Sequence, residues 1–476
     1  MRTVPVEPLA LERLVDLLPP ERGERLLAEA ERARAVFGDR VIWHVNATAQ
    51  GGGVAEMLQT LLAYGRGAGI DNRWLVLDGE AEFFSMTKRI HNLLHGEPGD
   101  GGPLGAAEHE VFERVLADNL ATLLTLIGPG DIVMLHDPQT AGLAPGLRGH
   151  GVHVVWRCHV GREEANACTD LAWGFLRRYL EGCDAFIFSL AEYAPDWVPS
   201  DRLVVIPPSI DPFTPKNADL DPATVEAVLA QVSLVTGAEP DGEVVYTRRD
   251  GSPGTLRRRT GLVMDGDPPP FDAPLVVQVS RWDRLKDMPG VMDGFVRLVE
   301  TGRHPSVHLV LAGPAVSAVS DDPEGAEVLE ECRARWRTLA PGLRQRVHLV
   351  SVPMDSVAAN ALIVNALQRH ARVVVQKSLV EGFGLTVTEA MWKGRPVIAS
   401  KVGGIRSQIV HGRDGLLIDD PADLDGLAAA LDRVLSDEEL ARRLGENARA
   451  RVLEEFLGGR HLMQYVDLFA SLVEGE

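Results

Sequence analysis

The sequence has little cysteine and lacks a long uncharged hydrophobic run. Its 476 residues include four cysteines with no C-x-x-C spacing, namely Cys158, Cys168, Cys183 and Cys332. This pattern fits neither a disulfide framework nor a zinc site, so we expect reduced thiols in a cytosolic protein. No uncharged stretch reaches about 18 apolar residues, which argues against a membrane span. The first residues, MRTVPVEPLALERLVDLL, carry charges through their apolar run and do not fit a signal peptide, so we expect a cytoplasmic protein.

Positive charge is also scarce. Lysine and arginine total 48 against 68 acidic residues, which gives a net charge of −20. Nucleic acids and anionic membranes are bound by basic surfaces, so neither is an expected partner. Phosphate can still be bound by a few placed cations and helix N-termini. The length exceeds that of one ordinary hydrophobic core and predicts two domains.

Predicted strands and helices alternate along the first part of the chain, after two short helices within residues 8–36. Such alternation is typical of a parallel, doubly wound α/β sheet. The expected strands cover 41–47, 72–79, 131–137, 153–159, 185–189 and 203–211. The expected helices cover 54–69, about 106–127 and about 170–181.

A second alternating series follows an irregular stretch, residues 212–272. That stretch contains one predicted helix, about 221–234, and a possible hairpin around Asp250-Gly251. The strands of the second series are expected at 274–280, 308–313, 347–352, 371–376, 395–400 and 415–419. Its helices are expected near 287–301, 325–340, 357–369, 385–393, 404–411 and 422–435, followed by 437–455 and 458–473.

These patterns predict two Rossmann-like domains facing each other across a cleft. The first would cover residues 1–211, with a helical extension at 1–40. The second would cover 212–455, with an irregular insertion at about 236–270. The helix in 456–476 would pack back on the first domain.

The segment LVEGFGLTVTEAM (379–391) places two glutamates, Glu381 and Glu389, eight positions apart around a Gly-Phe-Gly turn. The glycines let the backbone amides of 383–385 approach a ligand, at the start of a helix that favours phosphate. Glu381 in the loop and Glu389 in the helix could each accept hydrogen bonds from hydroxyl groups. The segment therefore predicts a cradle for a nucleotide sugar, although Glu389 alone is equally consistent with an acid interacting with the helix dipole.

Two further loops follow predicted strands, where ligands of α/β sheets bind. Gly51-Gly52-Gly53 could admit a phosphate or sugar, with a tight turn as the alternative. In SRWDRLKD (280–287), Arg281 and Lys286 could clamp a diphosphate, although alone this loop reads as a solvated mixed-charge segment.

Histidines end two strands of the first series. HDPQ (136–139) and RCHV (157–160) bring His136, Asp137 and His159 to the same edge of the predicted sheet. This group indicates either a binding site or structural histidines.

As a set, these motifs resemble retaining glycosyltransferase family 4, which has the GT-B fold. The resemblance is carried by EGFGLTVTEA, by the preceding SRWDRLKD, and by the order of glycine loop, strand-end histidine, Arg/Lys pair and E-x7-E. The segments HVNATAQGGGVAEML, HDPQ, WRCH and IPPSIDPFTPKN further resemble the trehalose-forming synthases within it.

On the donor side, the resemblance implies two cations and two carboxylates. Arg281 and Lys286 would neutralise a donor diphosphate, and Glu389 would hold the ribose hydroxyls. Glu381 would accept hydrogen bonds from the donor glucose. Backbone groups around the donor are implied at Gly52, Gly53, Gly382, Phe383, Gly384 and Leu385.

Residues of the first series would hold the sugars. His159 would lie against the donor sugar near the reacting carbon and join Arg281, Lys286 and Glu381 as the catalytic set. Asp137 would bind a sugar hydroxyl. Asn46 and Glu56, which flank the glycine loop, are expected on the acceptor side.

The resemblance implies transfer of glucose from a nucleoside-diphosphate glucose to free glucose, giving α,α-trehalose with retention at the anomeric carbon. Attack would come from the front face, with the leaving phosphate taking the acceptor's proton. No cofactor or metal is expected, and the expected partners are the two substrates, with a homodimer left open. Trehalose phosphorylase, a transferase with another small acceptor, and a catalytically silent sugar- or nucleotide-binding regulator are the alternatives. The nucleotide base and the role of residues 247–259 are not predicted.

Overall fold

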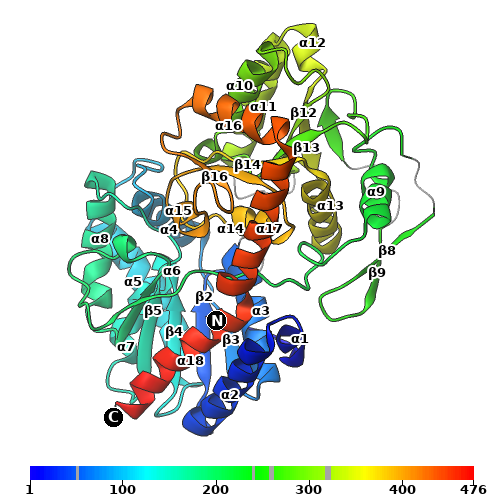
Figure 1. Ribbon diagram of the computed structural model, residues 1–476. Helices are drawn as coiled ribbons and strands as arrows, with labels where there is room; N and C mark the ends of the chain where they lie inside the picture. The colour runs from blue at the N-terminus through cyan, green and yellow to red at the C-terminus, as the bar shows by residue number, and fades with distance from the viewer. Residues whose placement is uncertain (50–52, 239–241, 257–261, 317–322, 476) are drawn as a thin grey trace. The chain divides into compact units, whose positions relative to one another are not determined.

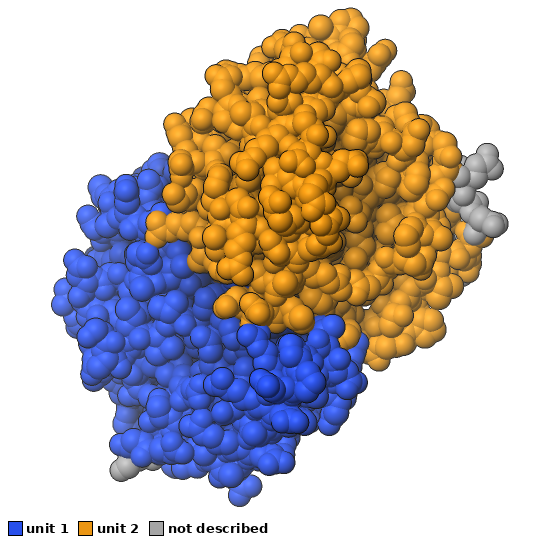
Figure 2. Space-filling view, in the orientation of Figure 1, with its two compact units in different colours: residues 1–209, 456–476 blue, residues 210–455 orange. Residues whose placement is uncertain are grey.

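The computed structural model describes residues 1–49, 53–238, 242–256, 262–316 and 323–475. The chain divides into two compact units, each described below by itself. Unit 1 contains residues 1–209 and 456–476, and unit 2 contains residues 210–455 (Figure 2).

Among its described residues, unit 1 contains a sheet of seven strands in the order β1-β3-β2-β4-β5-β6-β7. All neighbours pair in parallel except β1 with β3, so the edge strand β1 departs from the parallel sheet that the sequence predicts. The strands are β1 (Arg2–Val4), β2 (Ile42–Asn46), β3 (Asn72–Val76), β4 (Ile132–His136), β5 (His153–Arg157), β6 (Ala185–Phe188) and β7 (Leu203–Val205).

Helices cover both faces of this sheet (Figure 1), which is why its central strands β4 and β5 are buried along their whole length rather than at alternate residues. Along β4, Val133 and Leu135 join one hydrophobic cluster, and Ile132 and Met134 join the other. The helical elements are α1 (Glu12–Val15), α2 (Pro20–Phe37), α3 (Gly53–Gly67), α4 (Ala81–Leu94), α5 (Ala106–Leu124), α6 (Asp137–Thr140), η1 (Ala141–Leu143), α7 (Ala144–Leu147), α8 (Ala167–Leu180), η2 (Ala191–Tyr193) and α18 (Gly458–Glu474).

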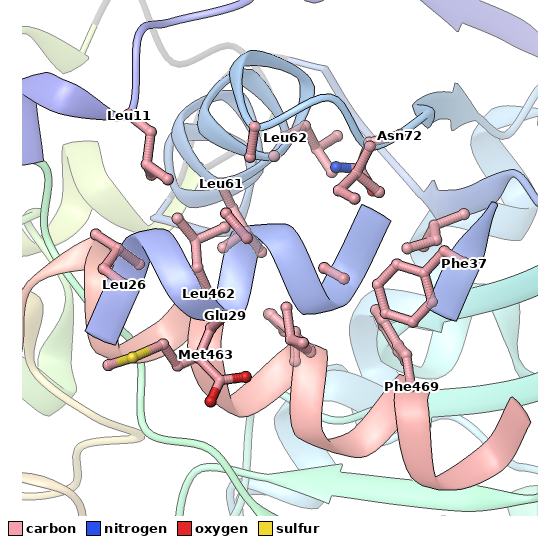
Figure 3. A pocket seen from close by; sticks show the side chains of 18 of the residues that line it. Leu11, Leu26, Glu29, Phe37, Leu61, Leu62, Asn72, Leu462, Met463 and Phe469 are labelled. Carbon is pink, nitrogen blue, oxygen red and sulfur yellow. The ribbon is translucent and has the colours of Figure 1, made fainter. Parts of the chain in front are cut away.

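Helix α18 packs against α2 and α3 although more than 380 positions separate it from them in the chain. A small cavity of about 60 Å³ lies between these three helices (Figure 3). Apolar side chains dominate its lining, and the rings of Phe37 and Phe469 meet edge to face at one end, with centroids 6.4 Å apart. The contact fixes α18 on unit 1 by burial of apolar surface.

The described part of unit 2 holds a second seven-stranded sheet, in the order β10-β13-β12-β11-β14-β15-β16. Again the pairing is parallel except at one edge, where β10 runs antiparallel to β13. The strands are β10 (Val263–Asp265), β11 (Leu275–Val279), β12 (His308–Pro314), β13 (Val347–Val352), β14 (Val373–Gln376), β15 (Val397–Ser400) and β16 (Leu416–Ile418).

Helices also flank the second sheet (Figure 1). Val373 and Val375 of β14 pack into a cluster with side chains of α10, α11 and α16, while Val374 between them is buried as well. The helical elements are α9 (Pro222–Gln231), η3 (Arg284–Lys286), α10 (Met288–Glu300), α11 (Pro323–Thr338), α12 (Pro341–Arg344), α13 (Val357–His370), α14 (Leu385–Trp392), α15 (Ile405–Gln408), α16 (Leu424–Ser436) and α17 (Glu438–Glu455).

The hairpin predicted around Asp250-Gly251 is confirmed. Strands β8 (Val244–Thr247) and β9 (Pro253–Leu256) pair antiparallel, and Gly251 takes a positive φ of 86° in the turn. The sequence prediction missed helix α4 and the two antiparallel edge strands. Among the described residues, every helix is too short or too polar to cross a bilayer.

Candidate active site

The carboxyl ends of two adjacent strands carry the first pair of predicted site residues. Strand β11 pairs with β14, and the loops after them hold Lys286 and Glu381. Lys286 Nζ lies 2.6 Å from Glu381 Oε2, and the two side chains are only 15% and 11% exposed. The structure therefore brings this cation and this carboxylate together as a half-buried ion pair.

A network of uncharged side chains fixes the carboxylate. Ser378 Oγ donates to Glu381 Oε2 at 3.2 Å, and Gln376 Nε2 donates to Ser378 Oγ at 3.1 Å. Gln376 also accepts a hydrogen bond from Thr386 Oγ1 at 2.9 Å. Because Gln376 and Ser378 are buried, these bonds hold Glu381 in one orientation.

A second buried pair, missed by the sequence reasoning, supports the turn that carries Lys286. Lys377 is fully buried and forms an ion pair with Asp287, which caps α10 by accepting from Gly290 N at 3.0 Å. Gln278 Nε2 donates to the Lys286 carbonyl at 2.7 Å. These contacts fix the position of Lys286. In the sequence, they were indicated only by the position of Lys377 beside the glutamate motif.

Arg281 lies on the same loop as Lys286, but its side chain pairs with a neighbouring aspartate. Its side chain is 53% exposed, and Nη2 pairs with Asp283 at 2.8 Å. The guanidinium is largely exposed and can turn toward a ligand, while Asp283, whose side chain is 13% exposed, keeps its hydrogen bond from Leu285 N.

The Gly-Phe-Gly turn is built as close backbone packing. Gly384 has a φ of 86°, and an added Cβ would lie 2.9 Å from Ile405 Cγ1. Gly404 N donates to the Gly382 carbonyl at 3.1 Å, and the Phe383 side chain is buried. The turn ends where Leu385 begins α14, so the amides at this helix N-terminus face a site suited to an anion.

Glu389 lies within α14 and is 3% exposed. Its Oε1 is 2.9 Å from Lys216 Nζ, while its Oε2 is buried with no hydrogen-bond partner among the described residues. A buried carboxylate oxygen without a donor is costly, so this atom is an acceptor available to a ligand. Lys216 lies in the segment IPPSIDPFTPKN, but nothing in the sequence indicated that it pairs with Glu389, because it lies far from α14 in the chain.

Next to Glu389, a second lysine is fully enclosed. Lys393 Nζ donates to the Glu389 carbonyl at 3.1 Å and to Asn217 Oδ1 at 3.2 Å. Burial lowers the pKa of Lys393 to about 7, against the opposing effect of Glu389. Lys216 thus pairs with the Glu389 carboxylate itself, while Lys393 bonds to the backbone carbonyl of the same residue.

In unit 1, Asp137 and His159 meet at the ends of β4 and β5. Asp137 takes a positive φ of 63°, and its Oδ1 accepts from the His159 backbone N–H at 2.8 Å. Burial raises the pKa of Asp137 to about 7. His159 Nε2 lies 3.0 Å from His136 Nδ1, so the predicted grouping of these three residues at one sheet edge is present.

The remaining predicted residues surround the glycine loop. Asn46 is buried, and its Oδ1 accepts a hydrogen bond from Trp74 Nε1 at 2.9 Å, so this oxygen already has a partner within the protein. Glu56 is exposed on α3, and Gly53 begins that helix. Gly52 lies outside the described residues.

Comparisons with known proteins define the class first. A family model described as "Glycosyl transferases group 1" matches residues 267–451. A trehalose-phosphate synthase (UDP-forming) from Burkholderia vietnamiensis superposes with a TM-score of 0.65, at 15% identity, over 92% of this chain and 99% of that chain. A sucrose-phosphate synthase from Thermosynechococcus elongatus gives 0.61, at 19% identity, over 92% and 100%. The fold is thus that of the GT-B glycosyltransferases.

Sequence relatives narrow the class. A model described as "Trehalose synthase, N-terminal domain" matches residues 44–195. A trehalose synthase from Thermococcus litoralis is 34% identical over 97% of both chains, and one from Rubrobacter xylanophilus is 36% identical over 93% of both. The chain belongs to the trehalose synthase family of glycosyltransferases. A trehalose phosphorylase from Pleurotus pulmonarius is 26% identical over 86% of this chain and 54% of its own.

Proposed function

We propose that this glycosyltransferase moves glucose from a nucleoside-diphosphate glucose to free glucose and forms α,α-trehalose with retention. The observation that supports a nucleotide-containing donor is the buried Glu389 Oε2, an acceptor with no hydrogen-bond partner among the described residues. A ribose offers hydroxyl donors to such an atom. The trehalose synthases among its relatives support the sugar product.

The three charged residues in the loops after β11 and β14 divide two tasks between them. Lys286 neutralises the charge that develops on the departing diphosphate, and Arg281 turns from its exposed loop to join it. Glu381, held by Ser378, accepts hydrogen bonds from the glucosyl hydroxyls. The amides at the start of α14 face the phosphates.

The bond changes balance without a protein nucleophile. The anomeric carbon loses its bond to the diphosphate oxygen and gains one to the acceptor oxygen on the same face. The acceptor's proton passes to the departing phosphate oxygen. The protein contributes alignment and charge neutralisation, which together account for large rate factors in such reactions. Because protein cations serve the diphosphate, activity should survive dialysis against EDTA.

Trehalose phosphorylase is the second candidate, favoured by the relative from Pleurotus pulmonarius. That reaction joins glucose 1-phosphate and glucose and uses no nucleotide. It would leave Glu389 Oε2 without a ribose to bind, which is why we place it second.

The test is a donor screen with isotopically labelled glucose. ADP-, UDP- and GDP-glucose are each supplied with free glucose, and glucose 1-phosphate with glucose is run in parallel. Sugar NMR reads the linkage and both anomeric configurations. We expect α,α-trehalose from at least one nucleotide donor; product from glucose 1-phosphate alone would establish the phosphorylase instead, and a β-linked product would exclude retention.

Glu381→Gln provides the site control for this screen. The variant keeps the size of the side chain and the Ser378 contact but loses the charge that faces Lys286. Turnover should fall strongly while the melting temperature changes little. Undiminished turnover would remove Glu381 from the site.

A further inference from the structure

The buried guanidinium of Arg157, at the end of β5, lies at the centre of a hydrogen-bond network in unit 1. The side chain is fully buried. Its Nε donates to His159 Nδ1 at 3.2 Å, and Nη2 donates to the Ile206 carbonyl at 3.0 Å. Its Nη1 lies 3.3 Å from His461 Nε2 and contacts the Tyr465 hydroxyl, and both of these residues belong to α18. Helix α18 therefore holds one side of the guanidinium.

Three histidines continue the network away from Arg157. His159 Nε2 is 3.0 Å from His136 Nδ1, and His136 Nε2 is 3.1 Å from His44 Nδ1. The His136 ring stacks on both neighbours, with centroids 5.3 Å from His159 and 5.4 Å from His44. Burial lowers the pKa of His44 to about 3 and holds the pKa values of His136 and His159 well below their usual range, so all three rings are neutral.

The direction of every bond in this chain follows from the chemistry of arginine. A guanidinium donates and never accepts, so the Nδ1 of His159 must carry a lone pair. A neutral ring then carries its proton on Nε2, which donates to His136 Nδ1. The same step repeats from His136 to His44. All three rings are thus Nε2–H tautomers.

The ring on α18 must take the opposite form. His461 Nε2 faces Arg157 and therefore accepts, so its proton is on Nδ1. His461 Nδ1 lies 2.8 Å from Ser209 Oγ, a suitable acceptor for that proton. The Tyr465 ring stacks on the His461 ring, with centroids 4.9 Å apart, which fixes its plane.

We infer that Arg157 is a positioning residue, held by α18, which sets the tautomers and orientation of His159, His136 and His44 on one side and of His461 on the other. The link to catalysis rests on the proposed function and on the position that the family resemblance implies for His159, against the donor sugar. Both ring nitrogens of His159 are engaged within the protein, so its imidazole neither takes nor supplies a proton in the reaction. Arg157 keeps this ring in place and neutral.

The direct test is NMR of the enzyme labelled with 15N at histidine, without substrate. Long-range proton–nitrogen correlations distinguish the two neutral tautomers from the imidazolium ion, and single His→Gln variants assign the signals. We expect Nε2–H forms at His44, His136 and His159 and an Nδ1–H form at His461. An Nδ1–H or charged ring at His159, or an Nε2–H form at His461, would overturn the inference. This measurement does not depend on the reaction catalysed.

A kinetic cycle tests whether Arg157 acts through His159. Arg157→Gln should lower kcat by about 10- to 100-fold, by analogy with the range known for residues that orient the imidazole ligands of metal sites. In a His159→Ala background the same change should cost less than about threefold, because the ring to be oriented is gone. Equal losses in both backgrounds would refute the coupling. Arg177→Gln, whose guanidinium pairs with Glu181 at the surface, is the matched control.

The two experiments distinguish a failure of the proposed function from a failure of the inference about Arg157. If no trehalose forms but the tautomers are as expected, the proposed function is wrong and the positioning role of Arg157 stands. If trehalose forms but His159 has the other tautomer, only the inference fails. Should Arg157→Gln not fold, the NMR spectrum of the unmodified enzyme still decides.

Discussion

The buried carboxylate of Glu389 gives the sharpest test of nucleotide binding. Glu389→Gln changes one atom and preserves the shape of the side chain in α14. In the enzyme, Oε1 faces Lys216 at 2.9 Å and Oε2 is left for the ligand. The amide of glutamine has only one accepting oxygen. When that oxygen faces Lys216, an NH2 group replaces the acceptor that we assign to the ribose.

The expected loss follows from the charge on the acceptor. A hydrogen bond to a charged group contributes roughly 1.5–3 kcal/mol. At about 1.4 kcal/mol for each factor of ten, the affinity for the nucleotide should fall roughly 10- to 150-fold. Stability should change far less, because Lys216 is 27% exposed and can turn toward water. The variant also replaces the buried anionic oxygen that lacks a donor by a neutral group, so we expect a stability change within about 1 kcal/mol.

Calorimetry with the free nucleoside diphosphate measures this affinity without turnover. The same titration with 2′-deoxy and 3′-deoxy nucleotides shows which hydroxyl is involved. For the deoxy compound that lacks the bonded hydroxyl, the variant and the unmodified enzyme should bind about equally. Glu438→Gln, an exposed partner of Arg372, is the matched control and should bind normally. An unchanged affinity in Glu389→Gln, or an equal loss with every deoxy compound, would refute the reasoning.

Three further predictions test the charge, the pH response and the packing of the site. Lys286→Met should lower kcat/KM by about 100- to 1000-fold in steady-state assays, because the departing diphosphate loses its cation. Burial raises the pKa of Asp137 from 3.8 to about 7, so between these values the folded state binds more protons than the unfolded state. Unfolding free energy should therefore fall as pH rises from about 4 to 7, and Asp137→Asn should flatten that part of a plot of Tm against pH. Gly404→Ala places a Cβ 2.6 Å from Phe383 Cα and should cost about 1–3 kcal/mol in denaturant unfolding, whereas Gly174→Ala, in open space on α8, should be neutral or stabilising.

The sequence predicts the central strands well because their signal is local. The apolar runs 132–135 and 373–375 are continuous rather than alternating, as expected for strands covered on both faces. The two antiparallel edge strands are short and were missed because they lie outside the alternating series: Arg2–Val4 precedes the first series, and Val263–Asp265 falls in the irregular stretch before the second. Such short segments acquire their structure from the neighbouring strand, and no periodic pattern can mark them.

The candidate site also contains some contacts that the sequence can predict and others that it cannot. The pairing of Lys286 with Glu381 could be anticipated from strand ends, since both loops follow strands of one parallel sheet. The pairing of Lys216 with Glu389 could not, because a loop and a helix 173 positions apart meet only in the folded chain. The histidines of β4 and β5 were identified, but nothing in the sequence shows that Arg157 donates to His159.

The state of His159 bears on where the acceptor's proton goes. A general base needs a free ring nitrogen, and the two nitrogens of this ring are bonded to Arg157 and His136. Protonating the ring would also place a second cation against the buried guanidinium, which is unfavourable in a poorly solvated site. Of the groups that the proposed reaction brings to the anomeric carbon, the departing phosphate is the one that gains negative charge as the bond breaks. The locked imidazole therefore supports proton transfer to that phosphate.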